Sequence, residues 1–332
     1  MSKKLSQRWS HFLERNKKSG GYLLKKIIMR RLYSIARAIL ILGLCFLILQ
    51  PLFNKLSASF MAEKDLYDPT IIVVPRNPTL DNYKIAAYLL DYWRILRNTL
   101  GLSLLASFAQ VACCTLVGYG FARFKFPLKR LWFACVILVI VVPPQTIMSS
   151  LYLNFRFFDI FGIIKAITGS TINLQNSIIP YIMLCMTGMG LKSGLYIFLI
   201  RQYFRGVPKE LEEAAYVDGC GNFQTFVRIM LPDATPIITS CFLFAFVWQW
   251  TDNFYARIFL KGTSLLATEL PALPTRLTDY IISLTGSGKA STAYGMAMIS
   301  TGMVMTIIPL LIIYVIAQRG FVESLSQTGL KM

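Results

Sequence analysis

The stretch PKELEEAAYVDGCGNFQTFVRIMLP, residues 208–232, lies between two hydrophobic stretches, 178–200 and 236–259, and is rich in carboxylates. A helix is expected from the start of this stretch to about Val217, because proline suits the first turn of a helix and the glutamates lie near its positive end. Gly219 should then end the helix, since glycine readily adopts the left-handed conformation found just past helix ends.

A second helix is expected over about 222–231, with Pro232 ending it. Four hydrophobic side chains have the spacing of one helix face: Phe223, Phe226, Val227 and Met230. The sequence therefore predicts a helical hairpin facing water. Its small residues Ala214 and Ala215 allow a partner to approach the backbone, and its glutamates can pair with basic residues of that partner. The alternative is an amphipathic hairpin lying on the membrane, although anionic headgroups repel carboxylates.

The remaining composition indicates an all-α, polytopic membrane protein. Hydrophobic residues make up 55% of the 332 residues and charged residues 15%. Six stretches reach the roughly 20 apolar residues that span a bilayer, and they predict six transmembrane helices at about 35–56, 97–122, 131–153, 178–200, 236–259 and 296–317. Pro143-Pro144 should kink the third span. Gly188, Gly190 and Gly194 permit close helix packing in the fourth span but also weaken its helix.

The formal net charge of +18 is concentrated near the ends of these spans. Residues 1–37 contain eleven Lys or Arg and 123–130 contain four, whereas 154–177 contain two and 57–96 contain four in 40 residues. Basic residues near span ends mark the cytoplasmic side, so we expect both termini, 123–130 and 201–235 in the cytoplasm. Topology and anionic headgroups thus explain the charge better than nucleic-acid binding does.

The first hydrophobic stretch is long and follows a basic segment, so it is expected to remain as a helix and not to be cleaved as a signal peptide. An amphipathic helix is expected near 80–95 in the loop that follows. The predicted organisation is a basic cytoplasmic tail, a first transmembrane helix, an outer loop, a core of five transmembrane helices that contains the cytoplasmic loop 201–235, and a short cytoplasmic tail: residues 1–34, 35–56, 57–96, 97–317 and 318–332.

The hairpin resembles the EAA loop of the permease subunits of ABC importers, which docks onto the ATP-hydrolysing subunit. Its spacing is Glu213-Ala-Ala, three residues, Gly219, nine residues and then Ile229-Met-Leu-Pro. The resemblance implies a type I ABC importer permease fold in the cell membrane. It assigns ATPase coupling to Glu212, Glu213, Ala214, Ala215, Asp218, Gly219, Ile229, Leu231 and Pro232. It also implies four kinds of partner: a homologous permease subunit, two copies of an ABC ATPase, an extracytoplasmic solute-binding protein and membrane lipid.

Further matches over about 79–332 are similar to the carbohydrate branch of these permeases, and within it to the second permease of maltose-type systems. The matching segments are TLDNY (79–83), NTL (98–100), YGFARFKFP (119–127), PP (143–144) and RQYFRGVPKELEEAA (201–215). The resemblance implies an oligosaccharide or a related carbohydrate as the solute, with an amino acid or peptide as the alternative. Two segments depart from the family pattern, 165–177 and WTDNF (250–254), and both lie where solute or binding protein would make contact.

No catalytic, metal or cofactor site is expected in this chain. The one histidine, His11, lies in the basic tail, and the spans contain neither a His-Glu-x-x-His motif nor clustered acidic metal ligands. Gly286-Ser-Gly-Lys289 lacks the first glycine of a phosphate-binding loop and the Ser or Thr after its lysine. The seven cysteines include no Cys-x-x-Cys pair and are expected to be packing residues. ATP hydrolysis is therefore expected in a separate subunit.

Ionisable and aromatic residues within the spans are the candidates for a solute path. In the fifth span, Trp248, Asp252 and Tyr255 have the spacing of one helix face near its outer end. An aromatic surface beside a carboxylate suits a sugar ring. The alternative is an interfacial aromatic belt with Asp252 facing headgroup water. Lys192 in the fourth span either snorkels to the cytoplasmic headgroups or lines the path.

Overall fold

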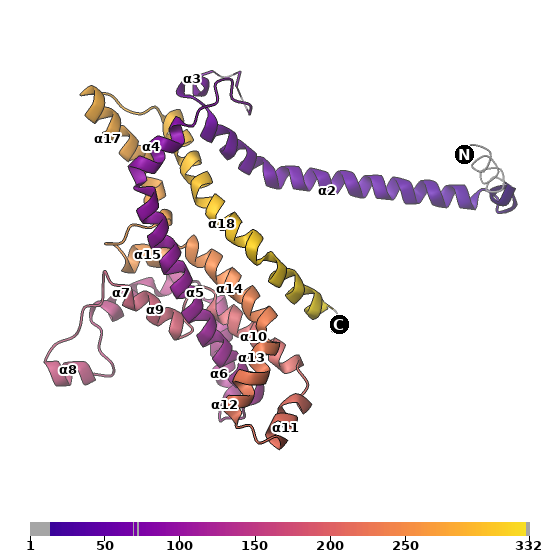
Figure 1. Cartoon of the computed structure of the whole chain (residues 1–332), viewed down its shortest axis with the longest axis vertical. Coiled ribbons are helices and arrows are strands. Elements are labelled where there is room, and N and C mark those ends of the chain that lie inside the picture. Colours follow the sequence, from indigo (N-terminus) through magenta and orange to yellow (C-terminus); the bar gives the residue numbers. More distant parts are fainter. Residues whose placement is uncertain (1–13, 69, 72, 330–332) are drawn as a thin grey trace.

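The computed structural model describes residues 14–68, 70–71 and 73–329, with side chains described up to residue 318. The described chain forms an elongated bundle of helices (Figure 1). Within that part of the chain, extended pairing is limited to two isolated bridges, Met61–Pro78 and Phe158–Ile172. Part of the predicted tail 1–34, including His11, lies outside the described residues, as do the last three residues of the chain.

Three described helices are long and apolar enough to cross a bilayer: α2 (Tyr22–Phe60), α5 (Tyr92–Arg123) and the Thr292–Gln318 part of α18 (Thr292–Gly329). Two bent helix pairs bring the number of candidate spans to five if each pair is one span. These helices confirm a polytopic, all-helical membrane protein. They do not give six continuous spans, because breaks interrupt the third, fourth and fifth predicted ones.

The third predicted span breaks at its two prolines. Helix α6 (Lys129–Val141) ends just before Pro143, and a 3-10 helix, η1 (Pro144–Ile147), leads into α7 (Met148–Arg156). The two halves meet at 100°, far more than a kink. Proline has no amide hydrogen to donate to the preceding turn, so two in succession end the helix.

The fourth predicted span divides into α9 (Ile179–Met186) and α10 (Ser193–Gly206). Between them Gly188 and Lys192 have positive φ angles of 74° and 63°. A Cβ on Gly194 would lie 2.8 Å from the carbonyl oxygen of Val136, so α10 contacts α6 at backbone distance. The glycines allow the predicted close packing, but the helix is interrupted here and not only weakened as predicted.

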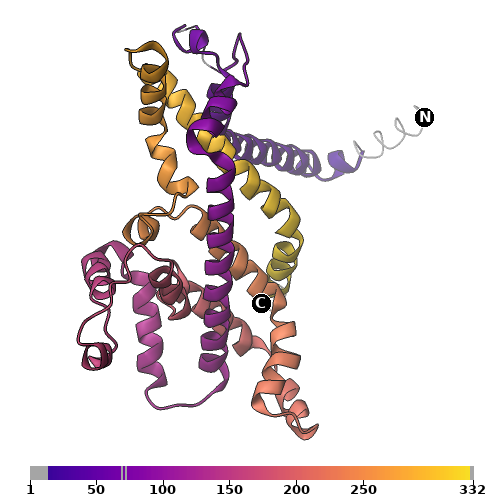
Figure 2. The ribbon, with the colours of Figure 1, turned by 60° about the vertical axis from the view of Figure 1, so that its left-hand side comes forward.

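The two ends of the bundle carry different structures (Figure 2). At one end, α18 is contacted by α3 (Glu63–Leu66), α4 (Asp81–Leu90), the 3-10 helix η3 (Leu270–Ala272) and α17 (Leu273–Thr285). The short helix α16 (Leu266–Glu269) packs against η3 and α5. Helix α4 confirms the helix expected near 80–95. At the other end lie the start of α6 and the hairpin.

Three hydrophobic clusters follow one another along α5. The first includes Phe204 and Met230 near the hairpin, the second Tyr181 and Phe259, and the third Leu90 at the opposite end of the bundle. Outside these clusters, α2 projects from the bundle and its most apolar 18-residue window contains no buried residue. Helix α18 continues to Gly329, so the predicted boundary between the last span and the tail 318–332 is not marked by a helix end.

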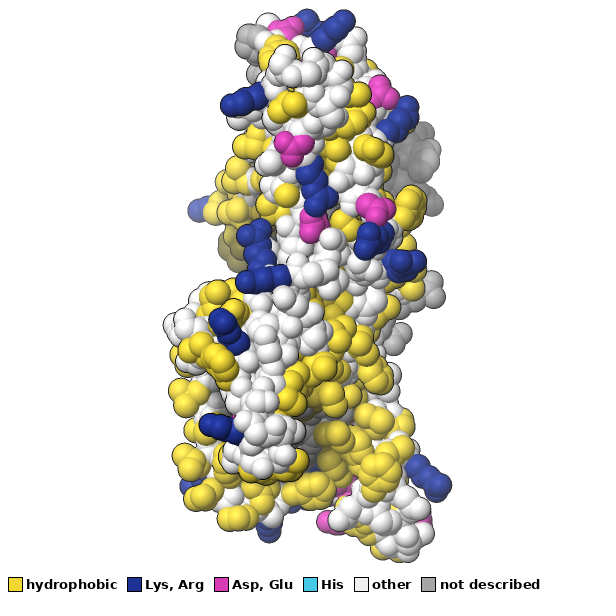
Figure 3. All heavy atoms as spheres, turned by 90° about the vertical axis from the view of Figure 1, so that its left-hand side faces the viewer, with side chains coloured by type: hydrophobic (Ala, Val, Ile, Leu, Met, Phe, Trp, Pro, Cys, Tyr) yellow, Lys and Arg dark blue, Asp and Glu magenta, His cyan; other side chains and the backbone are white. Residues whose placement is uncertain are grey.

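Figure 3 shows acidic and basic side chains scattered over the upper half of this face, a broad hydrophobic area below them and acidic side chains again at the lower tip. A short helix, α8 (Ile163–Thr168), projects from the side of the bundle within the loop that precedes α9 (Figure 1). This distribution fits a molecule whose middle lies in lipid and whose two ends reach water.

Candidate functional site

The hairpin begins with α11 (Glu210–Val217) and turns at Gly219, whose φ is 83°. The turn is closed by two backbone hydrogen bonds: the Gly219 amide donates to the Tyr216 carbonyl at 3.1 Å, and the Cys220 amide donates to the Ala215 carbonyl at 2.9 Å. The helix end at Val217 and the left-handed glycine are as predicted from the sequence.

The second leg differs from the single α-helix predicted over 222–231. It consists of α12 (Asn222–Thr225), a π-helical turn η2 (Phe226–Met230) and α13 (Leu231–Asp233). Pro232 lies in the first turn of α13 and does not end the helical backbone. The predicted single apolar face is also wrong. The wide π-turn changes the register, so Phe226 and Met230 are buried while Phe223 and Val227 are exposed.

A buried ion pair fixes the first leg to the bundle. The Tyr119 hydroxyl donates to Glu212 Oε1 at 3.0 Å, and Arg123 Nε lies 3.2 Å from the same oxygen. The Glu212 and Arg123 side chains are only 10% and 7% exposed. Tyr119 and Arg123 are four residues apart on α5 and therefore share a face. Arg123 Nη2 also donates to the Val207 carbonyl at 2.8 Å, which ties down the chain just before the hairpin.

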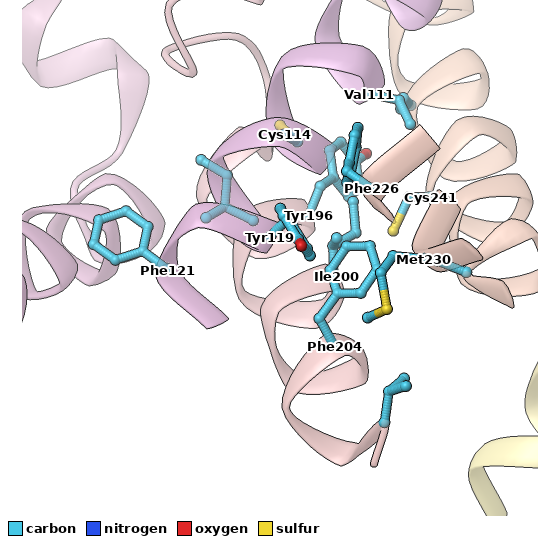
Figure 4. Packing of buried hydrophobic residues seen from close by; sticks show 14 residues of the cluster. Val111, Cys114, Tyr119, Phe121, Tyr196, Ile200, Phe204, Phe226, Met230 and Cys241 are labelled. Atoms are coloured by element: carbon cyan, nitrogen blue, oxygen red, sulfur yellow. The ribbon is translucent and has the colours of Figure 1, made fainter. Parts of the chain in front are cut away.

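Hydrophobic packing fixes the second leg. Figure 4 shows Phe226 and Met230 directed at Tyr119, Ile200 and Phe204, within the first cluster. The Phe226 and Tyr119 ring centroids are 4.7 Å apart. At the end of this leg, the hydroxyl of Tyr203 on α10 donates to the carbonyl of Asp233 at 2.6 Å. Both legs of the hairpin are thus held by α5 and α10.

The tip of the hairpin is exposed and contains apolar side chains. Val217 is 87% exposed and Phe223 is 76% exposed. The two small residues have different surroundings, because Ala214 is exposed whereas Ala215 is 3% exposed and packs within the hairpin. Among the other predicted coupling residues, Glu213, Asp218, Gly219 and Pro232 are exposed, and Ile229 and Leu231 are half-buried.

The predicted shared face of Trp248 and Asp252 is wrong, because α14 (Thr235–Trp250) ends between them. Trp248 is 44% exposed, whereas Asp252 is 6% exposed and Tyr255 is 4% exposed. Asp252 accepts a hydrogen bond from the Tyr181 hydroxyl at 2.9 Å. It also accepts from the backbone amides of Phe254, Tyr255 and Ala256 at the start of α15 (Phe254–Phe259). Its carboxylate therefore joins helix ends and does not face headgroup water.

Buried polar side chains connect the broken helices, and the sequence analysis did not identify them. Gln249 Nε2 donates to Gln110 Oε1 at 2.9 Å, and Gln110 Nε2 donates to Ser193 Oγ at 2.8 Å. The single Tyr181 hydroxyl proton is shared between two acceptors, Gln249 Oε1 and the Asp252 carboxylate. Their polar character inside apolar spans was the available signal, since such residues need partners within the protein. Among the described side chains, no group of three His, Cys, Asp or Glu residues is placed to hold a metal ion.

Comparison with known proteins supports a transport component. The profile of the family described as "Binding-protein-dependent transport system inner membrane component" matches residues 115–326. The arabinooligosaccharides transport system permease protein AraQ of Halalkalibacterium halodurans is 25% identical, over 87% of this chain and 93% of that protein. The galactooligosaccharides transport system permease protein GanQ of Bacillus subtilis is 26% identical, over 93% of this chain and 100% of that protein.

The fold has a solved counterpart. A chain in the crystal structure of a bacterial ABC transporter involved in the import of the acidic polysaccharide alginate superposes with a TM-score of 0.68 at 18% identity, covering 87% of this chain and 96% of that chain. The matched proteins are transport permeases of the inner membrane and not enzymes, and their family works with ATPase, permease and solute-binding partners. The chain therefore belongs to the family of binding-protein-dependent transport system inner membrane components.

Proposed function

We propose that this chain is a carbohydrate permease subunit of an ATP-driven importer and that the hairpin 208–232 receives the ATPase. The observation that carries the proposal is the combination of a fixed base and a free tip. The base is held by the Glu212–Arg123 ion pair and by the buried Phe226, and the tip exposes Val217. An exposed apolar tip on a rigid base is suited to transmit a push from a partner.

The contacts of the base determine which helices would move when the ATPase moves the tip. Closure of two ATPase copies would move the tip, and the hairpin would carry that movement to α5 and α10, to which both of its legs are attached. The spans can change their relative angles at three helix breaks: at Pro143, between α9 and α10, and after Trp250. Hydrolysis itself belongs to the partner.

The proposal includes six membrane crossings with both termini in the cytoplasm. Support comes from the basic-residue asymmetry and from the placement of the hairpin at the end of the bundle where α6 begins. Reporter fusions after residues 128, 215 and 325 should indicate the cytoplasm, and fusions after 70, 165 and 275 the outside. An external signal at 215 would end the docking proposal.

The proposed organisation keeps the predicted segments: tail 1–34, first span 35–56, outer loop 57–96, core 97–317 and tail 318–332. The apolar surface of α2 lacks neighbours over its middle turns, and in the assembled importer lipid and the homologous permease would cover it. A solute-binding protein would deliver the solute to the outer end, where α4 and α17 lie.

The solute is proposed to be an oligosaccharide or a related carbohydrate. The support is that the matched permeases are named for arabinooligosaccharides and galactooligosaccharides, together with the segments shared with the carbohydrate branch. Trp248 remains the aromatic candidate for ring contact because it is exposed, whereas Asp252 and Tyr255 are proposed to shape the path by holding the turn after α14. An importer of an amino acid or peptide is the alternative.

The test is ATP-dependent uptake by the purified complex of this chain with its permease, ATPase and binding-protein partners in proteoliposomes. Radiolabelled oligosaccharides should accumulate inside the vesicles, and amino acids and tripeptides should not. Accumulation of an amino acid or peptide without any saccharide would replace the proposed solute class with the alternative.

A further inference from the structure

Lys192 and Trp248 come together at the break in the fourth predicted span. Lys192 directly precedes α10, and its positive φ of 63° directs the chain out of the helical path. Its Nζ lies 5.0 Å from the ring centroid of Trp248 on α14, within the range of a cation–π contact. Both side chains are exposed on the isolated chain.

The depth of this pair follows from helix lengths. Lys192 lies eight residues before Ile200, the last residue of the fourth predicted span, which is about 12 Å at the helical rise. Trp248 lies thirteen residues past Thr235, the first residue of α14, which is about 20 Å. Counted from those cytoplasmic ends, both residues therefore lie well inside a hydrocarbon core of about 30 Å.

An ammonium group at this depth is costly if it faces lipid. Among the ion pairs of the described side chains none includes Lys192, and Asp252, close to Trp248 in sequence, is already bonded to Tyr181. Snorkelling to the cytoplasmic headgroups does not explain the geometry either, because the ammonium lies over the Trp248 ring. The surface that carries the pair is therefore suited to face a hydrated path.

A cavity of about 220 Å³ opens beside this lysine, where α6 ends and α9 gives way to α10. Its lining includes Val142, Pro144, Gly190 and Tyr255, and Lys192 is the one charged residue among the described residues that form it. A neutral solute makes little use of a cation that, among the described residues, has no carboxylate partner in such a wall. A carboxylate or phosphate, by contrast, forms a charge-assisted hydrogen bond with it.

We propose that Lys192 and Trp248 form a subsite for an anionic saccharide, in which the ammonium binds a carboxylate or phosphate of the solute and the indole packs against a sugar ring. The inference rests on the proposed carbohydrate-permease function and names the charge of its solute.

The test uses the assembled complex in proteoliposomes with three probes: neutral maltotriose, trigalacturonate and maltotriose monophosphate. The native complex should import at least one anionic probe in preference to maltotriose. Lys192→Gln should lower the uptake of that probe about tenfold or more, because it removes one hydrogen bond between charged groups. Lys192→Arg should keep most of the uptake. Lys261→Gln is the matched control, because Lys261 also lies over an aromatic ring, 5.9 Å from the Tyr152 centroid.

The outcomes separate the two proposals. If the native complex prefers maltotriose to both anionic probes, the anionic subsite is overturned and the carbohydrate function is not affected. This comparison uses the native complex alone, so it does not depend on the folding of any variant. Equal uptake of the anionic probe by Lys192→Gln and the native complex would also overturn the subsite. Import of amino acids or peptides with no saccharide uptake would overturn the carbohydrate function and the subsite with it. The use of trigalacturonate or of the monophosphate identifies which anionic group the subsite accepts.

Discussion

Glu212→Gln should detach the first leg of the hairpin from α5. The substitution removes the negative charge 3.2 Å from Arg123 Nε while keeping an oxygen that the Tyr119 hydroxyl can reach. Both members of the ion pair are about nine-tenths buried, so the arginine is left as an uncompensated buried charge. Breaking one side of such a pair costs about 3–5 kcal/mol, and the retained Tyr119 hydrogen bond places this variant near the lower end. A cost of about 3 kcal/mol raises the detached population of the hairpin about a hundredfold.

Hydrogen exchange of the backbone amides in 208–232, measured on the purified complex, reports this population directly. The amides of Gly219 and Cys220, which close the turn, should exchange about a hundred times faster in Glu212→Gln than in the native protein. Glu210→Gln is the matched control, because Glu210 lies on the same helix but is exposed. ATP-driven uptake should fall in parallel with the loss of protection.

The double variant Glu212→Gln with Arg123→Met tests whether the cost comes from the unpaired charge. Removing both charges should restore most of the lost protection, since replacing a whole buried pair is often neutral. The reasoning is refuted if Glu212→Gln exchanges like Glu210→Gln. It is also refuted if the double variant is as unprotected as the sum of its two single changes.

Three further substitutions follow from individual contacts. Gly194→Ala should lower the melting temperature of the complex by several degrees, because its Cβ would lie 2.8 Å from the Val136 carbonyl oxygen. Gly120→Ala should leave the melting temperature unchanged, because its Cβ would have no contact under 4.0 Å. Gly219→Ala should cost about 1–2 kcal/mol through its positive φ of 83° alone, since its surroundings are open; equal melting temperatures for this variant and the native complex would contradict that cost. Asp252→Asn should lower the stability of the complex by about 1 kcal/mol, because it weakens the hydrogen bonds at the start of α15, and should leave the concentration dependence of uptake unchanged. A changed concentration dependence with unchanged stability would indicate a direct solute contact.

The sequence was informative where local chemistry decides the structure. The hairpin with its helix end at Val217, the left-handed Gly219 and a change of direction at Pro143 follow from rules about single residues, although the break at Pro143 is sharper than the predicted kink. Hydropathy located the apolar segments but treated each as one straight span. It could not show that the fourth predicted span divides or that α14 ends at Trp250, because those breaks depend on packing between segments distant in sequence.

The same limit applies to the site. Carboxylate density and spacing indicated a docking hairpin, but Glu212 turned out to face inward, bonded to Tyr119 and Arg123 about ninety residues earlier. The motif YGFARFKFP contains both partners at a spacing of four, but that spacing alone does not indicate which carboxylate they hold. The π-turn that buries Phe226 also has no simple sequence signature, and it divides the expected apolar face into two buried and two exposed residues.

The central claim is that the exposed tip of the hairpin contacts the ATPase. Site-specific photo-crosslinking in the native membrane tests it with a photoreactive amino acid placed at Val217, at Phe223 or at Tyr88, which are 87%, 76% and 74% exposed. Tyr88 lies on α4 at the opposite end of the bundle. The account predicts adducts with the ATPase subunit from Val217 and Phe223 and none from Tyr88. Adducts with the ATPase from Tyr88 and none from either tip position would contradict it.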